Sequence, residues 1–219
     1  MNPIICADFP EPDVIRVGDT YYMICATMHF FPGGTLLKSY DLVHWEIAAH
    51  VFERLDDTPA EQLEGEQSIY GKGMWAASLR YHKDTFYVCF ASYDTGKTYI
   101  YRTKNINEPW EKRSLDGVYH HPSLLFDEDG RIYMGYGFNE VRILELNDTL
   151  TAPKEGGFER RLVEEKFEVV GVYTKPDMPK NRGMKLVMSE TKTYALSQNL
   201  PVYQPATFRD DAVVEELRT

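Results

Sequence analysis

Apolar and polar positions change along the chain in short runs that are bounded by turn residues. Residues 18–26, with the sequence GDTYYMICA, show the pattern, because a Gly-Asp turn leads into aromatic and aliphatic side chains. Runs of this length that are rich in Tyr, Val, Ile and Phe are typical of β-strands. No stretch keeps a convincing apolar period of about 3.6 residues over the length of a helix. The pattern therefore predicts an all-β fold.

The same phrase returns later in the chain. Residues 83–91, KDTFYVCFA, repeat the motif of residues 18–26 almost position by position. Trp45 lies 23 positions after Tyr22, and Trp110 lies 23 positions after Tyr87. The two copies therefore share both their residue types and their internal spacing. This repetition argues against a unique catalytic role for the two tryptophans and predicts a structural contact at the end of each unit.

Two further units extend the repeat. A third copy runs over residues 129–153 without the tryptophan, and a weaker fourth begins near residue 183. Strand-rich units of about 45 to 65 residues match the blades of a β-propeller, in which radial repetition protects the sheet edges. We therefore predict a propeller with three clear blades. The polar, Glu-rich segment 53–73 is expected to be a loop at the rim.

Composition and charge exclude several classes of function. The 24 Lys and Arg residues against 34 Asp and Glu give a net charge of −10, which disfavours binding to phosphate backbones of nucleic acids. No stretch approaches the roughly 20 apolar residues of a membrane span, and the first residues show no signal-peptide pattern. We therefore expect no nucleic-acid or membrane partner and a cytoplasmic location. Three cysteines without zinc-binding spacing predict neither a disulfide framework nor a structural metal site.

Five stretches, in this order along the chain, resemble glycoside hydrolase family 43. They are residues 2–22, which include the motif PEPD, 28–33 (MHFFPG), 39–45 (SYDLVHW), 73–81 (GMWAASLRY) and 121–127 (HPSLLFD). The family contains β-xylosidases, α-L-arabinofuranosidases and arabinanases built on five-bladed propellers. The resemblance covers residues 2 to about 150 and fades beyond residue 160.

The resemblance implies a single five-bladed propeller over residues 1–219. Five blades need more chain than these 219 residues, so the fourth and fifth blades, from about residue 160, are expected to be shortened. Either the remaining strands seal a compressed ring, or an open arc exposes sheet edges that favour a homo-oligomer.

The resemblance also implies an activity, the hydrolysis of xylosides or arabinofuranosides in plant-polysaccharide fragments. The mechanism is inverting: a carboxylate base activates water and a carboxylic acid protonates the leaving oxygen, with the two groups about 6.5–9.5 Å apart. No cofactor or metal is implied. Two alternatives remain: a catalytically impaired relative that binds carbohydrate, and a truncated product without a function of its own.

Glu11 stands where the family's Pro-Asp-Pro motif carries the base. Glu keeps a carboxylate but adds one methylene, which moves its oxygens by about 1 Å and can cost about a hundredfold in rate. Asp13 lies two positions along the same expected strand, shares the face of Glu11 and is a better substitute than Asp8. The alternative is that Glu11 is a solvated acid in a proline-flanked turn.

His121 stands where the family's second Asp orients the general acid. A cationic imidazole there would lower the pKa of the acid, which is the wrong direction for protonating a leaving group. The alternative is a loop histidine without a chemical role beside His120, which we place among the substrate-binding residues. Two neighbouring histidines alone do not indicate a metal site, because their side chains point apart on a strand.

Glu168 is the candidate for the general acid. It precedes Tyr173 by five positions, as the family's acid precedes a tyrosine, but the glycine that follows the acid in the family is absent here. The alternative is that Glu168 belongs to a solvated acidic face.

Aromatic rings are expected to form the sugar platform, because the apolar face of a pentose packs well on an aromatic ring. Trp75, inside the matched GMWA stretch, is the first candidate. Phe30 and Phe31 are expected beside it.

Overall fold

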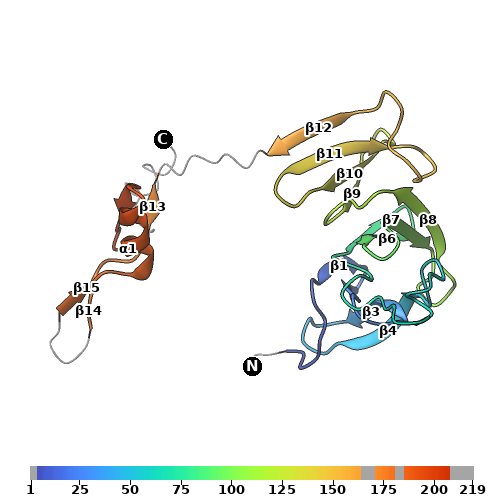
Figure 1. Cartoon of the computed structure of the whole chain (residues 1–219), viewed down its shortest axis with the longest axis horizontal. Helices are drawn as coiled ribbons and strands as arrows, with labels where there is room; N and C mark the ends of the chain where they lie inside the picture. Colours follow the sequence, from blue (N-terminus) through green and yellow to red (C-terminus); the bar gives the residue numbers. More distant parts are fainter. Residues whose placement is uncertain (1–3, 164–170, 181–184, 208–219) are drawn as a thin grey trace. The chain divides into compact units, whose positions relative to one another are not determined.

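The computed structural model describes residues 4–163, 171–180 and 185–207 (Figure 1). They belong to two compact units, Met1–Glu165 and Lys166–Thr219. None of the helices in the described ranges is long and apolar enough to span a membrane.

The first unit consists of three four-stranded antiparallel sheets, each made of consecutive strands. Blade 1 contains β1 (Asp13–Val17), β2 (Thr20–Cys25), β3 (Gly33–Ser39) and β4 (Glu46–Phe52). Blade 2 contains β5 (Ser78–His82), β6 (Thr85–Ser92), β7 (Lys97–Thr103) and β8 (Glu111–Asp116). Blade 3 contains β9 (Ser123–Phe126), β10 (Ile132–Tyr136), β11 (Val141–Leu146) and β12 (Glu159–Val163). The prediction of an all-β propeller with three clear blades is confirmed.

The repeated turn motifs of the sequence form the turns of the first hairpin in blades 1 and 2. Val17 pairs with Thr20 across a two-residue turn in which Gly18 has a φ of 59°. In blade 2 the corresponding turn contains Lys83 and Asp84, with φ of 46° and 58°. Two-residue hairpins need positive φ at the turn, because only these turns match the twist of the strands. The turn residues thus set the register of both hairpins.

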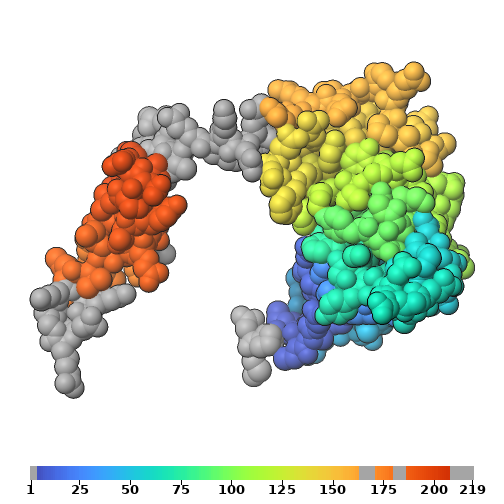
Figure 2. All heavy atoms as spheres, viewed as in Figure 1, coloured from blue at the N-terminus to red at the C-terminus, as the bar shows by residue number. Residues whose placement is uncertain are grey.

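Alternate residues of the strands build two apolar clusters between the blades. Val88 and Phe90 of β6 pack in one cluster with Ile24 and Leu36 of blade 1. Cys89, between them in sequence, packs in the cluster that joins blades 2 and 3. Blade 2 is therefore covered on both faces, and the atoms of the three blades form one continuous body (Figure 2).

The two repeated tryptophans have structural roles, as predicted. Trp45 directly precedes β4 and packs on the small cluster that contains Met23 and Leu37. Trp110 directly precedes β8 and packs on the cluster between blades 1 and 2. The equal spacing in the sequence therefore reflects equivalent places in the two blades.

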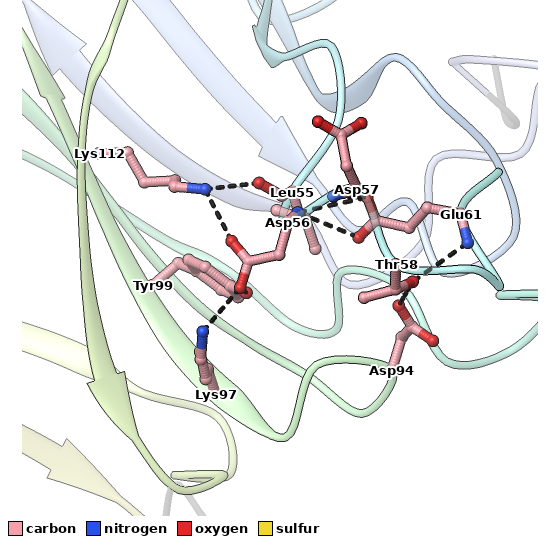
Figure 3. A network of polar contacts seen from close by, with 9 residues as sticks. All are labelled: Leu55, Asp56, Asp57, Thr58, Glu61, Asp94, Lys97, Tyr99 and Lys112. Atoms are coloured by element: carbon pink, nitrogen blue, oxygen red, sulfur yellow. Dashed lines mark hydrogen bonds and ion pairs between the residues drawn. The ribbon is translucent and has the colours of Figure 1, made fainter.

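Segment 53–73, expected to be a rim loop, is held against blade 2 by a network of hydrogen bonds and ion pairs (Figure 3). The Asp56 carboxylate accepts hydrogen bonds from Lys97 at 2.8 Å, Lys112 at 2.7 Å and the Tyr99 hydroxyl at 2.9 Å. Burial by itself would raise the pKa of Asp56, but these three donors outweigh it and hold that pKa at about 2. A carboxylate with this environment is ionised and structural at neutral pH.

A second part of the network closes the segment on itself. The buried Glu61 carboxylate accepts the backbone N–H groups of Asp56 at 3.2 Å and Asp57 at 2.9 Å. The Thr58 hydroxyl donates to Asp94, which follows β6 closely, at 2.6 Å. Burial raises the pKa of Glu61, although the two N–H groups act in the opposite direction. The loop therefore has a defined shape beside blade 2.

The second unit has shorter elements. β13 (Val172–Tyr173) pairs in parallel with β16 (Val202–Tyr203), and β14 (Met178–Lys180) pairs antiparallel with β15 (Lys185–Val187). β15 lies just after residue 183, near which the weaker fourth unit of the repeat was expected to begin. Within the described residues of this unit, neither sheet has the four strands of a blade. The single domain over residues 1–219 stays a prediction.

One helix, α1 (Glu190–Ser197), was not predicted from the periodicity of the sequence. The reason is that α1 has eight residues and buries a single side chain, Ala195, so no apolar stripe marks it. Its start is specified by Ser189, whose hydroxyl accepts the N–H of Lys192 at 3.1 Å as an N-cap.

Candidate active site at the blade ends

The cavity that Glu11, Asp13 and His121 line is built from one repeated stretch of each blade. Its volume is about 370 Å³, and Arg80 lines it together with three tripeptides: Glu11-Pro12-Asp13, Ala76-Ala77-Ser78 and His121-Pro122-Ser123. Each tripeptide ends on the first residue of the first strand of its blade. Glu11, Ala76 and His121 therefore occupy equivalent places in blades 1, 2 and 3. The internal repeat of the sequence brings them to one cavity.

Glu11 reaches from blade 1 toward blade 2. Its half-buried carboxylate accepts a hydrogen bond from the backbone N–H of Ala76 at 3.0 Å. The residue has a φ of 49° and precedes β1, which begins at Asp13. The expectation that Glu11 and Asp13 share one strand is thus wrong, although both side chains line the same cavity. An N–H donor at this place orients the carboxylate before any ligand binds.

Asp13, the predicted substitute for the base, is engaged in an ion pair. Its Oδ2 accepts the backbone N–H of Leu79 at 2.8 Å and Nη1 of Arg80 at 2.7 Å. The same guanidinium donates to the Ser123 hydroxyl at 2.6 Å and to the Leu124 carbonyl at 3.2 Å. Because Arg80 and the Leu79 N–H both engage Asp13 Oδ2, the geometry leaves Glu11 as the carboxylate that is better placed to meet a ligand.

His121 lies at the corresponding place in blade 3. It is exposed and has a φ of 47°, close to the value of Glu11. Positive φ is uncommon for residues other than glycine, so its occurrence at both places reflects the same turn into the first strand. The structure therefore brings a carboxylate and an imidazole to the cavity at equivalent blade positions.

His120 belongs to a hydrogen-bonded pair whose other member, Tyr93, was missed from the sequence. The Tyr93 hydroxyl lies 2.9 Å from both ring nitrogens of His120. Burial, and then the negative charge of Glu11, raises the pKa of the Tyr93 phenol. Tyr93 directly follows β6, at the blade end where the candidate residues gather. That position was the one signal in the sequence that could have identified it.

Trp75 is placed by a close approach of two backbones. Met74 pairs with Thr27 of the first blade and with Ser92 of β6. A Cβ at Gly73 would lie 2.9 Å from the Thr27 carbonyl oxygen, so this approach requires glycine. The Trp75 indole donates to the Gly71 carbonyl at 3.1 Å and contacts the Tyr93 ring edge-on at 5.4 Å. It is half-buried beside the cavity residue Ala76.

The two predicted phenylalanines take different positions. Phe30 is 49% exposed, whereas Phe31 is half-buried and contacts Phe52 edge-on at 6.0 Å. Their loop is tied near Trp75, because Gly71 donates its N–H to His29 at 3.0 Å. Neither ring is among the described residues that line the cavity.

Glu168, the candidate general acid, lies outside the described residues. Across the ranges that the structure describes, no group of three or more His, Cys, Asp or Glu side chains could hold a metal ion.

Comparison with known proteins identifies the family. The family model described as "Glycosyl hydrolases family 43" matches residues 1–179. A β-xylosidase of Formosa agariphila is 37% identical over 133 residues, covering 59% of this chain and 22% of that protein. A non-reducing end α-L-arabinofuranosidase of Bacteroides ovatus is 37% identical over 137 residues, covering 60% and 25%. The chain thus spans about a quarter of the length of these relatives.

Solved structures agree with this result. A bifunctional GH43-CE protein of Bacteroides eggerthii matches with a TM-score of 0.71 and 43% identity, over 74% of this chain and 21% of that chain. A xylan β-1,4-xylosidase of Bacillus halodurans matches with a TM-score of 0.63 and 26% identity, over 77% and 34%. The repeated blades, the cavity at their ends and these matches together show that the chain belongs to glycosyl hydrolases family 43.

Proposed function

We propose that the protein hydrolyses xylosides or arabinofuranosides of short plant-polysaccharide fragments, with Glu11 as the base. The observation that carries this proposal is the carboxylate of Glu11 at the cavity, oriented by the N–H of Ala76. Relatives named β-xylosidase and α-L-arabinofuranosidase support the substrate class. The role of Asp13 in this scheme is structural, because its carboxylate forms an ion pair with Arg80.

The reaction is a single displacement. Glu11 takes a proton from water while the water oxygen attacks the anomeric carbon, and the bond to the leaving oxygen breaks as an acid donates a proton to that oxygen. One proton is taken and one is given, and the configuration inverts without a covalent intermediate because water attacks the face opposite the leaving oxygen. Glu168 is the acid of this scheme. His121 contributes a hydrogen-bonding imidazole at the place of the family's second Asp.

A hydrolysis screen tests the assignment of the base. Wild-type protein and Glu11→Ala are compared on 4-nitrophenyl β-D-xyloside and 4-nitrophenyl α-L-arabinofuranoside, with Glu46→Ala on the exposed part of β4 as the matched control. Loss of a general base lowers kcat by about a hundredfold or more. We expect this loss for Glu11→Ala alone. Full turnover by Glu11→Ala would show that another group is the base.

The second candidate function is sugar binding without cleavage. Among the described residues that line the cavity, Glu11 and Asp13 carry carboxylates, and the ion pair with Arg80 engages one of them. Calorimetric binding of xylo-oligosaccharides, with no product after prolonged incubation, would favour this function over hydrolysis.

A further inference from the structure

Four aromatic rings follow one another beside the cavity, at the ends of blades 2 and 3. The ring centroids of Trp75 and Tyr93 lie 5.4 Å apart, those of Tyr93 and His120 5.4 Å, and those of His120 and Phe138 5.5 Å. We call this set of four residues the aromatic row. Phe138, in the turn between β10 and β11, is its outer end.

The row arises from the repeat of the fold. Trp75 and His120 each lie three positions before the first strand of their blade, while Tyr93 and Phe138 lie just after the second strand. Neighbouring antiparallel strands have opposite directions, so both kinds of position are at the same end of a blade. Two backbone hydrogen bonds confirm the match, from Trp75 N–H to the Ala91 carbonyl at 3.0 Å and from Gly137 N–H to the His120 carbonyl at 2.8 Å.

The rings of His120 and His121 lie 6.3 Å apart, so the row adjoins the cavity that His121 lines. Trp75 precedes Ala76, and His120 precedes His121, and both following residues line the cavity. A ligand bound at Glu11 and extending past Ala76 or His121 would therefore meet the rings of the row.

The outer rings of the row face solvent instead of filling a core. Phe138 is 75% exposed and Tyr93 is 38% exposed, whereas Phe90 of the interblade cluster is fully buried. The turn that carries Phe138 depends on Gly137, which has a φ of 152° and whose added Cβ would lie 1.7 Å from the Glu140 carbonyl oxygen. Phe138 is not an isolated exposed side chain, because it continues a row of rings through His120, and contiguous exposed apolar surface of this kind is typical of a ligand contact.

The chemistry of the row fits a neutral saccharide. None of its four members carries a carboxylate, an ammonium or a guanidinium group, and the Tyr93 hydroxyl and His120 ring nitrogens lie at its polar edge. Sugar rings offer apolar faces for aromatic contact and hydroxyls for hydrogen bonds. The row supplies no side chain with a permanent charge to pair with a charged ligand.

We propose that Tyr93 and Phe138 form a further sugar-binding subsite, which extends from the cavity and makes the protein prefer pentose oligosaccharides over disaccharides. This inference rests on the proposed function, because the row serves the ligand that reaches Glu11. Phe138 supplies the distal platform. Tyr93 supplies a ring face, and its hydroxyl and His120 hold each other in place.

The test measures how affinity depends on ligand length. Dissociation constants for xylobiose and xylohexaose, and for arabinobiose and arabinohexaose, are determined by calorimetry in a Glu11→Gln background, which prevents turnover during titration. Four proteins are compared: the background itself, and the background with Phe138→Ala, with Tyr93→Phe or with Tyr40→Ala. Tyr40 is 68% exposed on the turn after β3, outside the row, and is the matched control.

We expect Phe138→Ala to weaken hexaose binding about threefold to tenfold and to leave disaccharide binding within about twofold. Tyr93→Phe, which keeps the ring, should retain the preference for hexaose. An equal effect of Phe138→Ala on both lengths, or no effect, overturns the subsite while the proposed function stands. If none of the four saccharides binds wild-type protein or is cleaved by it, the proposed function and the subsite are both wrong.

Discussion

The Arg80 guanidinium lies 2.7 Å from the Asp13 carboxylate and joins the first strands of blades 1 and 2. The same side chain donates to Ser123 and Leu124, so that it also holds the first strand of blade 3. One arginine thus connects three blades at the floor of the candidate site. Because the pair is two-thirds buried, its loss leaves an unpaired carboxylate beside the cavity.

Replacement of this arginine should therefore destabilise the protein. We expect Arg80→Met to lower the free energy of unfolding by about 2–3 kcal/mol, since several hydrogen bonds to charged groups are lost at once. Urea denaturation measures the change. Arg16→Met is the matched control, because Arg16 pairs with a fully exposed Asp19 and should change the free energy by less than about 0.5 kcal/mol. Equal effects of the two substitutions would contradict the role given to Arg80.

The stability contributed by Asp56 should depend on pH. Its folded-state pKa, about 2, lies below the ordinary value of 3.8, so the stabilisation is complete above pH of about 4 and is lost as the pH falls toward 2. We expect Asp56→Asn to cost roughly 2 kcal/mol at neutral pH and to flatten the acid limb of the stability curve. Urea unfolding at a series of pH values measures both effects.

Asp57→Asn is the control for that experiment, because the Asp57 carboxylate makes an exposed pair with Arg54. It should stay within about 0.5 kcal/mol of the wild type. An acid limb that keeps its slope in Asp56→Asn would assign the pH dependence to other carboxylates.

Restoring a carboxylate at residue 121 should increase activity. His121 lines the cavity at the blade position equivalent to Glu11. Its motif resembles the family motif in which an Asp takes this position. We expect His121→Asp to raise kcat/KM on aryl pentosides by on the order of tenfold, since a positioned carboxylate supports proton transfer. His50→Asp, on the exposed surface of β4, should leave kcat/KM unchanged. Lower turnover by His121→Asp would mean that the imidazole itself takes part, and unchanged turnover would mean that residue 121 has no part in the reaction.

Gly137 should be intolerant of a side chain. Its φ of 152° and the 1.7 Å approach of an added Cβ to the Glu140 carbonyl predict that Gly137→Ala loses about 1–3 kcal/mol of unfolding free energy. Gly135 is the control two positions earlier, where a Cβ would meet its nearest atoms at an ordinary 3.9 Å. Thermal unfolding of both variants measures the difference. A stable Gly137→Ala protein would show that the turn before β11 can rearrange.

Predictions from the sequence succeeded where local patterns specify the structure. The Gly18 and Lys83-Asp84 turns and the matched tryptophans indicated equivalent blades, because turn chemistry and strand alternation act over a few neighbouring residues. They failed for α1, whose eight residues bury too little to leave a periodic pattern. The site was predicted in part, since Glu11 and His121 lie in recognisable motifs, whereas Tyr93 and Phe138 follow strands in stretches without a motif.

The sequence by itself determined the number of clear blades, the turns that set the register of their first hairpins and the equivalent places of the two tryptophans. Only the tertiary structure decided that Arg80 neutralises Asp13, that Glu11 is oriented by the N–H of Ala76, and that Tyr93 and Phe138 join Trp75 and His120 in one row. The physical reason is distance along the chain. These contacts join residues on separate blades or strands, and their atoms come within hydrogen-bonding or van der Waals reach only when strands pair within a blade and blade packs against blade.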